Sequence, residues 1–215
     1  EMFESDVQFV LDEYMEGLIT EEHFLKSARI WEHYESDYRE LIEFSKEKGV
    51  PVIAANAPRR YVNLVRRLGK GALLALSEEG KQFLPPLPYP DASPEYEDKF
   101  RAIMLAHQSM ISRAFVDQEP TNLHEDKDLN QTESAIEESN SPYGEDFERM
   151  LEAQNLWDAS MAWSIASHLN RNPENRIIHV TGSFHTNFAL GIPEHLKNYL
   201  PRLNLLTVTM VPSLE

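Results

Sequence analysis

Apolar residues recur three and four positions apart over most of the chain, which is the spacing of one face of an α-helix. Cap residues, Pro and Gly mark where these stretches begin and end. The pattern predicts helices that begin near Ser5, Thr20, Asp37, Pro58, Ser93, Phe147 and Pro193, with the third closed by Gly49 and the fourth by Gly69. The stretch from Phe147 to Leu169 is predicted to be the longest helix.

Three short apolar runs rich in β-branched residues lie between or after these helices, at Val50–Ala55, Arg176–Thr181 and Leu205–Val211. Runs of this kind are typical of buried strands. Helices that alternate with such strands predict an α/β fold, with a central, largely parallel sheet flanked by helices. Three strands are few for such a sheet, and the chain opens on Glu1 without an initiator Met. We therefore expect one or more N-terminal strands to precede this sequence.

The chain is acidic, with 36 Asp and Glu against 20 Lys and Arg and a formal net charge of −16. This balance argues against binding to nucleic acid or to an anionic membrane surface. Residues 117–146 hold ten Asp and Glu, one Lys and almost no large apolar residue. Such a stretch cannot offset the entropy lost when a chain is ordered. We expect a single domain over residues 1–215 that carries a mobile acidic insertion at 117–146.

The strongest local signal is a Gly-x-x-His sequence, Gly182 to His185, that directly follows the second predicted strand. Ligands of open α/β sheets gather beyond the carboxyl ends of strands, so His185 stands at a candidate site. An imidazole there can bind a metal ion or act as a general base. The alternative is a loop histidine held by hydrogen bonds, and the sequence leaves both open. The chain has no Cys, which excludes thiolate metal ligands.

A second signal lies where the first predicted strand meets a helix, because Arg59, Arg60 and Tyr61 occupy the first helical turn. Free N–H groups at a helix N-terminus favour anions, and basic side chains there oppose the helix dipole. An acidic ligand or partner would explain the two arginines. The alternative is that Arg59 or Arg60 pairs with a carboxylate of the chain. Tyr61 is open to a role in the core, as a hydrogen-bond donor or as a phenolate ligand of ferric iron.

The long predicted helix carries a third signal. Gln154 and Asp158 interrupt its apolar stripe at positions where Leu would be expected. Buried polar side chains need partners, so these two residues face either a ligand pocket or a structural polar network.

Four stretches in the same order resemble the ChaN-like haem-binding lipoproteins, a family in one superfamily with the Tiki and TraB proteins. They run from Glu1 to Gln8, from Val52 to Arg60, from Ala153 to Ala162 and from Gly182 to Pro193. The resemblance implies an α/β fold, haem binding for iron acquisition, a homodimer, and a lipid anchor at the bacterial outer membrane, where a haem receptor is a possible partner. The family's first strand, with its Gly-Glu-x-His motif, and its lipidated Cys are not in this sequence.

Superfamily relatives imply a second activity, metal-dependent hydrolysis or proteolysis. The matching positions here are Glu1, Arg59 or Arg60, Gln154 and His185. In this alternative, Glu1 and His185 bind a divalent metal ion together with a histidine absent from this sequence, Arg59 stabilises an oxyanion, and Gln154 positions the substrate.

Haem binding without catalysis is the favoured hypothesis. Haem needs an apolar slot, an axial ligand and cations for its propionates. We expect Arg59 and Arg60 to meet the propionates, Gln154 to line the cofactor site, and Tyr61 or His185 to ligate the iron.

Overall fold

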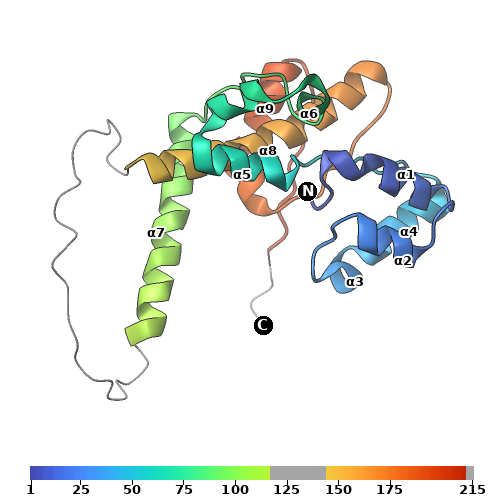
Figure 1. The fold of residues 1–215 in the computed structure, drawn as a ribbon, viewed down its shortest axis with the longest axis horizontal. Coiled ribbons are helices and arrows are strands. Elements are labelled where there is room, and N and C mark those ends of the chain that lie inside the picture. The colour runs from blue at the N-terminus through green and yellow to red at the C-terminus, as the bar shows by residue number, and fades with distance from the viewer. Residues whose placement is uncertain (117–143, 212–215) are drawn as a thin grey trace.

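The computed structural model describes residues 1–116 and 144–211, with the backbone alone for residues 107–116. Regular structure in these ranges is helical (Figure 1). The α-helices are α1 (Gln8–Met15), α2 (Glu21–Ser27), α3 (Tyr34–Asp37), α4 (Arg39–Lys48), α5 (Arg59–Leu68), α6 (Glu78–Lys81), α7 (Pro94–Val116), α8 (Gly144–Arg171) and α9 (Ile192–Tyr199). Short 3₁₀ turns stand at Ser5–Val7, Lys70–Ala75, Ser183–His185 and Asn187–Ala189.

The prediction of an α/β fold with a central parallel sheet is wrong, because the described residues contain no β-strand. Their one β-type contact is an isolated parallel bridge between Glu4 and Asn56. The third run predicted as a strand is not even buried, since Leu206 is 85% exposed and Met210 is 89% exposed. Apolar, β-branched composition therefore identified segments that lie outside the helices, but these segments do not pair as strands.

The first of the three runs shows what replaces a neighbouring strand. Gln8 of α1 donates from Nε2 to the Val52 carbonyl at 2.9 Å, and its Oε1 accepts from the Ala54 N–H at 2.6 Å. The hydroxyl of Ser164 on α8 donates to the Ala55 carbonyl at 3.1 Å. Side chains of flanking helices thus satisfy backbone groups that a sheet would otherwise pair.

Most predicted helix boundaries agree with the structure. Thr20 caps α2 by accepting from the His23 N–H, and Gly49 ends α4 with a φ of 63°. The predicted cap at Asp37 is wrong, because this residue ends α3 and Tyr38 stands before α4. The longest described helix is α8, as predicted.

Helices α1–α4 form one group around their own apolar core (Figure 1). Phe24 of α2 is fully buried at its centre. Its ring stacks on Tyr14 at a centroid distance of 4.4 Å and meets Tyr34 edge-on at 6.1 Å. Burying rings of this size supplies most of the free energy that holds such short helices together.

Helix α8 is the centre of a second group. One side of α8 packs on α5 through Leu156 and Ala159, and the other packs on α9 through Ala162 and Ala166. The small side chains on α8 allow close approach of both neighbours. This arrangement brings the N-terminus of α5 and the turn before α9 to the same central helix, which is what positions the candidate sites.

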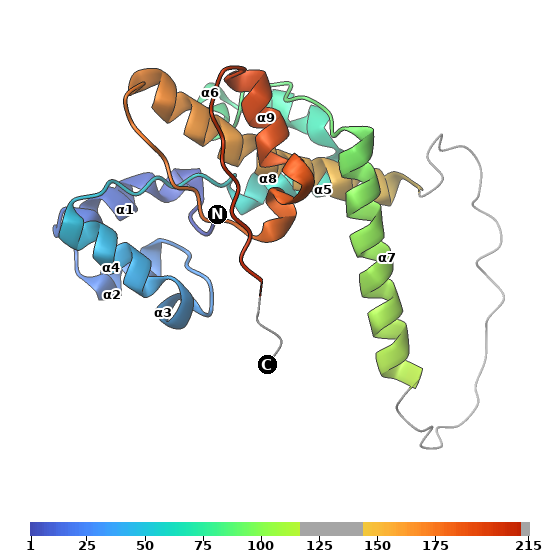
Figure 2. The ribbon, with the colours of Figure 1, turned by 180° about the vertical axis from the view of Figure 1, so that it is seen from behind.

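Helix α7 begins in the second group and then projects away from the other helices, as both views show (Figures 1 and 2). Most of the predicted insertion at 117–146 lies outside the described residues, whereas 144–146 form the start of α8. No helix in the described ranges combines the length and the apolar character that a membrane span requires.

Candidate functional site

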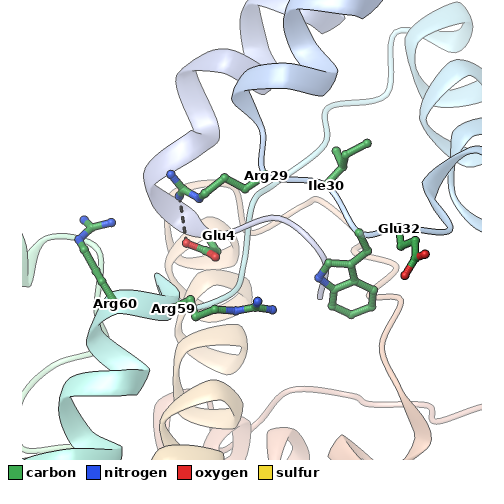
Figure 3. Close-up of a pocket in the computed structure, with 7 residues that line it drawn as sticks. Glu4, Arg29, Ile30, Glu32, Arg59 and Arg60 are labelled. Carbon is green, nitrogen blue, oxygen red and sulfur yellow. Dashed lines mark ion pairs between the residues drawn. The ribbon is translucent and has the colours of Figure 1, made fainter.

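A pocket of about 630 Å³ lies where the two helix groups meet (Figure 3). Its volume falls within the roughly 300–1,000 Å³ of small-molecule and cofactor sites. Glu4 and the segment from Arg29 to Glu32 line it from the first group, and Arg59 and Arg60 line it from α5. The apolar contribution comes from Ile30 and Trp31, which stand beside three guanidinium groups.

Two of these arginines are held by carboxylates of the chain. Arg29 pairs with Glu4 at 3.0 Å and also with Asp6. Arg60 pairs with the other oxygen of Asp6. Asp6 therefore ties the loop before α3 to the first turn of α5, and fixes one wall of the pocket.

Arg59 differs from its neighbours because it makes no hydrogen bond or ion pair with any described residue. Its side chain extends toward the segment from Ile30 to Glu32, whereas Arg60 points the other way (Figure 3). The alternative of pairing within the chain, left open by the sequence, thus applies to Arg60. Arg59 is free to meet an anionic group.

Tyr61 stands next to these arginines but not in the pocket lining. Its hydroxyl accepts from Arg60 Nη2 at 3.3 Å. It also lies against Gly80 of α6, where an added Cβ would come within 2.9 Å of the phenol oxygen. The structure therefore places the Tyr61 hydroxyl at α6, and its predicted role as an iron ligand remains a prediction.

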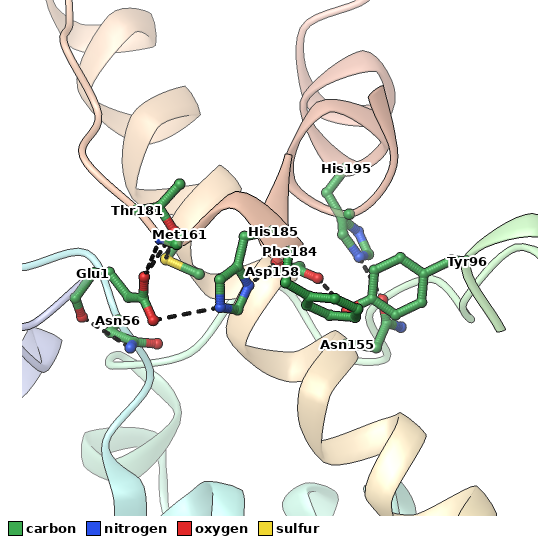
Figure 4. A network of polar contacts seen from close by, with 12 residues as sticks. Glu1, Asn56, Tyr96, Asn155, Asp158, Met161, Thr181, Phe184, His185 and His195 are labelled. Atoms are coloured by element: carbon green, nitrogen blue, oxygen red, sulfur yellow. Dashed lines mark hydrogen bonds and ion pairs between the residues drawn. The ribbon is translucent and has the colours of Figure 1, made fainter. Parts of the chain in front are cut away.

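His185 belongs to a separate, buried polar network (Figure 4). Its Nδ1 lies 2.5 Å from Asp158 Oδ1, and its Nε2 lies 3.4 Å from Glu1 Oε1. The 3₁₀ turn after Gly182 presents the imidazole between these two carboxylates. The family resemblance implied that His185 and Glu1 belong to one site, and the two side chains lie close together in the structure.

Asp158 is the centre of this network and is fully buried on α8. Its second oxygen accepts from the hydroxyl of Tyr96 on α7. Gly191, with a φ of 75°, stands so close that a Cβ there would meet Asp158 Oδ2 at 2.8 Å. Only glycine fits this combination of backbone conformation and contact.

Glu1 closes the exposed end of the network. Its Oε2 accepts from the Gly182 N–H at 2.6 Å and from the Thr181 hydroxyl at 3.0 Å. Burial alone would raise the pKa of the Glu1 carboxyl, but the hydrogen bond with His185, followed by that from Gly182, lowers it to about 2. Glu1 is thus a carboxylate at neutral pH.

The two flanking carboxylates also decide the charge of His185. Burial alone would lower the pKa of His185, whereas the hydrogen bonds with Asp158 and Glu1 raise it to about 9. Burial raises the pKa of the Asp158 carboxyl, and His185 and then Tyr96 act against this rise. We take the group as an imidazolium between carboxylates, since each hydrogen bond then carries opposite charges.

Gln154 extends the network rather than lining the arginine pocket. Gln154 lies four residues before Asp158 on α8, and its side chain is close enough to the Tyr96 hydroxyl to act against the rise that burial causes in the pKa of that phenol. Both polar interruptions of the α8 stripe thus meet the same phenol, which favours the structural-network alternative of the two that the sequence left open. The predicted cofactor-binding role of Gln154 remains untested.

Sequence reasoning did not identify four further residues in or beside these sites. Arg29 and Trp31 line the pocket from an irregular loop, where no periodicity marks them. Tyr96 lies in α7, and no motif marks it as a site residue. His195, on α9, is a neighbouring buried histidine whose Nε2 lies 2.8 Å from Asn155 Oδ1.

Metal ligands are sparse in the described ranges. No group of three or more His, Asp or Glu side chains there has the arrangement of a metal site. Glu1 faces one ring nitrogen of His185, and Asp158 bonds the other. A carboxylate commonly supports a metal-binding histidine in this second way.

Comparison with known proteins identifies the family. No curated protein and no solved structure matched the chain. A family profile described as "Haem-binding uptake, Tiki superfamily, ChaN" matches residues 1–196, which confirms the resemblance drawn from the four stretches and supports a haem-binding role. The chain thus belongs to the ChaN family of haem-binding uptake proteins in the Tiki superfamily.

Proposed function

We propose that this chain binds haem in the pocket between the two helix groups, with Arg59 meeting a propionate. The observation that carries the proposal is the guanidinium of Arg59, which stands beside Ile30 and Trp31 and pairs with no residue that the structure describes. A cation of this kind next to an apolar wall suits a flat, apolar dianion. Membership of a haem-binding family supports the same cofactor.

The chemistry of the pocket residues fits the porphyrin ring and its propionates, and no lining residue is a usual ligand of haem iron. The Trp31 indole and the Ile30 side chain offer apolar surface for a porphyrin face. Arg59 offers a planar guanidinium that suits a carboxylate, whereas the charges of Arg29 and Arg60 are balanced by Glu4 and Asp6. Bound haem would supply a ferric or ferrous iron, and the chain's residues hold and orient it.

Replacement of Arg59 by Ala is expected to weaken haemin binding. Arg59 is exposed, so its pairing with a propionate contributes about 1 kcal/mol, or roughly fivefold in Kd, and less at high salt. The measurement is a haemin titration followed by the Soret band and by tryptophan fluorescence, at two salt concentrations. Arg67→Ala is the matched control, because Arg67 is an exposed arginine in the last turn of the same helix, outside the pocket. Equal affinities of the two variants would contradict the proposed site, and no saturable binding by the unchanged chain would end the haem proposal.

A second candidate function, metal-dependent hydrolysis, is favoured by one observation. Glu1 and the Nε2 of His185 face each other at 3.4 Å, and buried Asp158 supports the imidazole from behind. A divalent metal ion between them would activate water. Calorimetric titration with Mn²⁺ or Zn²⁺ tests this alternative. Saturable heat that His185→Gln abolishes would support it, and absence of saturable heat in the unchanged chain would contradict it.

An envelope location remains a proposal that rests on the resemblance alone. The same holds for a lipid anchor at the outer membrane, a homodimer and a haem receptor as partner. Gel filtration with multi-angle light scattering, with and without haemin, tests the dimer, and a single monomeric mass in both states would contradict it.

A further inference from the structure

The pocket offers a ligand less positive charge than its three guanidinium groups suggest. Arg29 pairs with Glu4 at 3.0 Å and also with Asp6. Arg60 pairs with the other oxygen of Asp6. Two carboxylates thus balance two guanidiniums. Among the described lining residues, Arg59 is the arginine that no carboxylate of the chain occupies.

Asp6 is a fixed anion rather than a mobile surface carboxylate. It lies in the 3₁₀ turn Ser5–Val7, where the Ser5 N–H donates to the Asn56 carbonyl at 2.7 Å. The Ser5 hydroxyl donates to the Phe83 carbonyl at 2.9 Å. The Asp6 side chain is only 10% exposed, so its two ion pairs are screened by water less than surface pairs are. The position of this carboxylate therefore determines where both partner arginines lie.

Arg60 borders the pocket but is directed away from the space that a ligand would fill. Its guanidinium lies 4.4 Å from the centroid of the Tyr61 ring, and its Nη2 donates to the Tyr61 hydroxyl at 3.3 Å. The side chain points away from the segment that carries Ile30, whereas that of Arg59 extends toward this segment (Figure 3). Asp6 and Tyr61 together keep Arg60 occupied.

This distribution of charge suits a ligand that brings one carboxylate to the protein. A guanidinium can form two parallel hydrogen bonds with one carboxylate, so Arg59 is matched by a single acid group. A second carboxylate on the same ligand would meet no unoccupied cation in the described lining, and the exposed carboxylate of Glu32 would repel it. Such a group is better solvated by water.

We propose that Asp6 is a specificity-determining residue of the pocket, because it holds Arg29 and Arg60 and so limits recognition to one carboxylate. One haem propionate then meets Arg59, and the other stays in solvent. Asp6 acts through the two arginines and is a positioning residue. The inference rests on the proposed function, and names its ligand class as flat apolar acids bound through a single carboxylate.

The test compares metal-free protoporphyrin with its monomethyl and dimethyl esters on the 215-residue chain, followed by porphyrin fluorescence. The diacid can offer either of two carboxylates to Arg59 and the monomethyl ester offers one, so their dissociation constants should differ by the statistical factor of about two. The dimethyl ester offers none and should bind about fivefold more weakly than the monomethyl ester, which is the contribution of one exposed ion pair.

Asp6→Asn tests the assigned role directly. It nearly keeps the shape of the side chain and removes the charge that holds the two arginines, so a second carboxylate gains a cation. The diacid should then bind about tenfold more tightly than the monomethyl ester, from the statistical factor and one further ion pair. Glu13→Gln, the matched control, removes an equal charge from an exposed position of α1 outside the lining and should keep the ratio at about two. The dimethyl ester should bind both variants as it binds the unchanged chain, which shows that the apolar part of the pocket is intact.

The outcomes separate this inference from the proposed pocket. A diacid bound about tenfold more tightly than the monomethyl ester by the unchanged chain would overturn the inference, whether or not Asp6→Asn folds, because two carboxylates would be recognised with Asp6 in place. A ratio that stays near two in Asp6→Asn, with the dimethyl ester still bound, would also overturn it. Absence of binding of all three porphyrins to the unchanged chain would overturn the pocket itself.

Discussion

Asp158→Ala is expected to destabilise the protein by about 3–5 kcal/mol, the cost of removing one partner from a buried ion pair. Asp158 is fully buried, and it bonds both His185 and the Tyr96 hydroxyl. Without it, His185 retains Glu1 alone, and the phenol loses its carboxylate partner. The measurement is the free energy of unfolding from urea denaturation at pH 7.

Two further variants make this result specific. Asp158→Asn keeps an acceptor for Tyr96 but loses the charge beside His185, so it should cost less, about 1–2 kcal/mol. Glu148→Ala removes an exposed carboxylate from the same helix and should be nearly neutral. A loss below 1 kcal/mol for Asp158→Ala would show that the network contributes little, and would remove the basis for treating His185 as an ion-paired residue.

Helix positions were readable from the sequence because their signals are local. Thr20 as a cap and Gly49 as a helix end depend only on bonds within a few residues, and the structure has both. Asp37 failed as a cap because it belongs to the last turn of another short helix, α3, and Tyr38 stands between α3 and α4.

The predicted sheet failed because pairing is not local. Val52, Ala54 and Ala55 have the composition of a buried strand, yet their backbone groups bond to Gln8 and Ser164. Apolar composition reports burial, and the identity of the bonding partner depends on elements many residues away. For the same reason the sequence did not identify Trp31 as a pocket residue, because it lines the pocket from an irregular loop.

The candidate sites were predicted in part for a related reason. Arg59 and His185 follow extended segments and open helical turns, so a local motif marked each. The local motifs did not show which charged side chains lie next to Arg59 and His185. Asp6 pairs with Arg60 and not with Arg59. Asp158 and Glu1 lie on either side of the His185 ring. These partners leave Arg59 without a carboxylate among the described residues and place His185 between two of them.

Raising the pH from 7.5 to 9.5 is expected to cost the unchanged chain about 2 kcal/mol of stability through His185. Its pKa is raised from about 6.5 in the unfolded chain to about 9 in the folded one. The folded state therefore binds a proton that the unfolded state has lost. This contribution is fully present below pH 6.5 and disappears as the pH rises through 9.

Comparison with His185→Gln isolates this contribution. Burial lowers the pKa of His179 to about 3 and also lowers that of His195, so these two groups act below the chosen pH window. Burial lowers the pKa of the N-terminal amine, and this group is common to both proteins, so its effect cancels in the difference. Urea denaturation at both pH values should show a stability loss about 2 kcal/mol greater in the unchanged chain than in the variant. His33→Gln, at an exposed histidine, should behave as the unchanged chain does. Equal pH dependence with and without His185 would mean that the imidazole is neutral between its carboxylates, and the site would then hold a proton acceptor rather than a fixed cation.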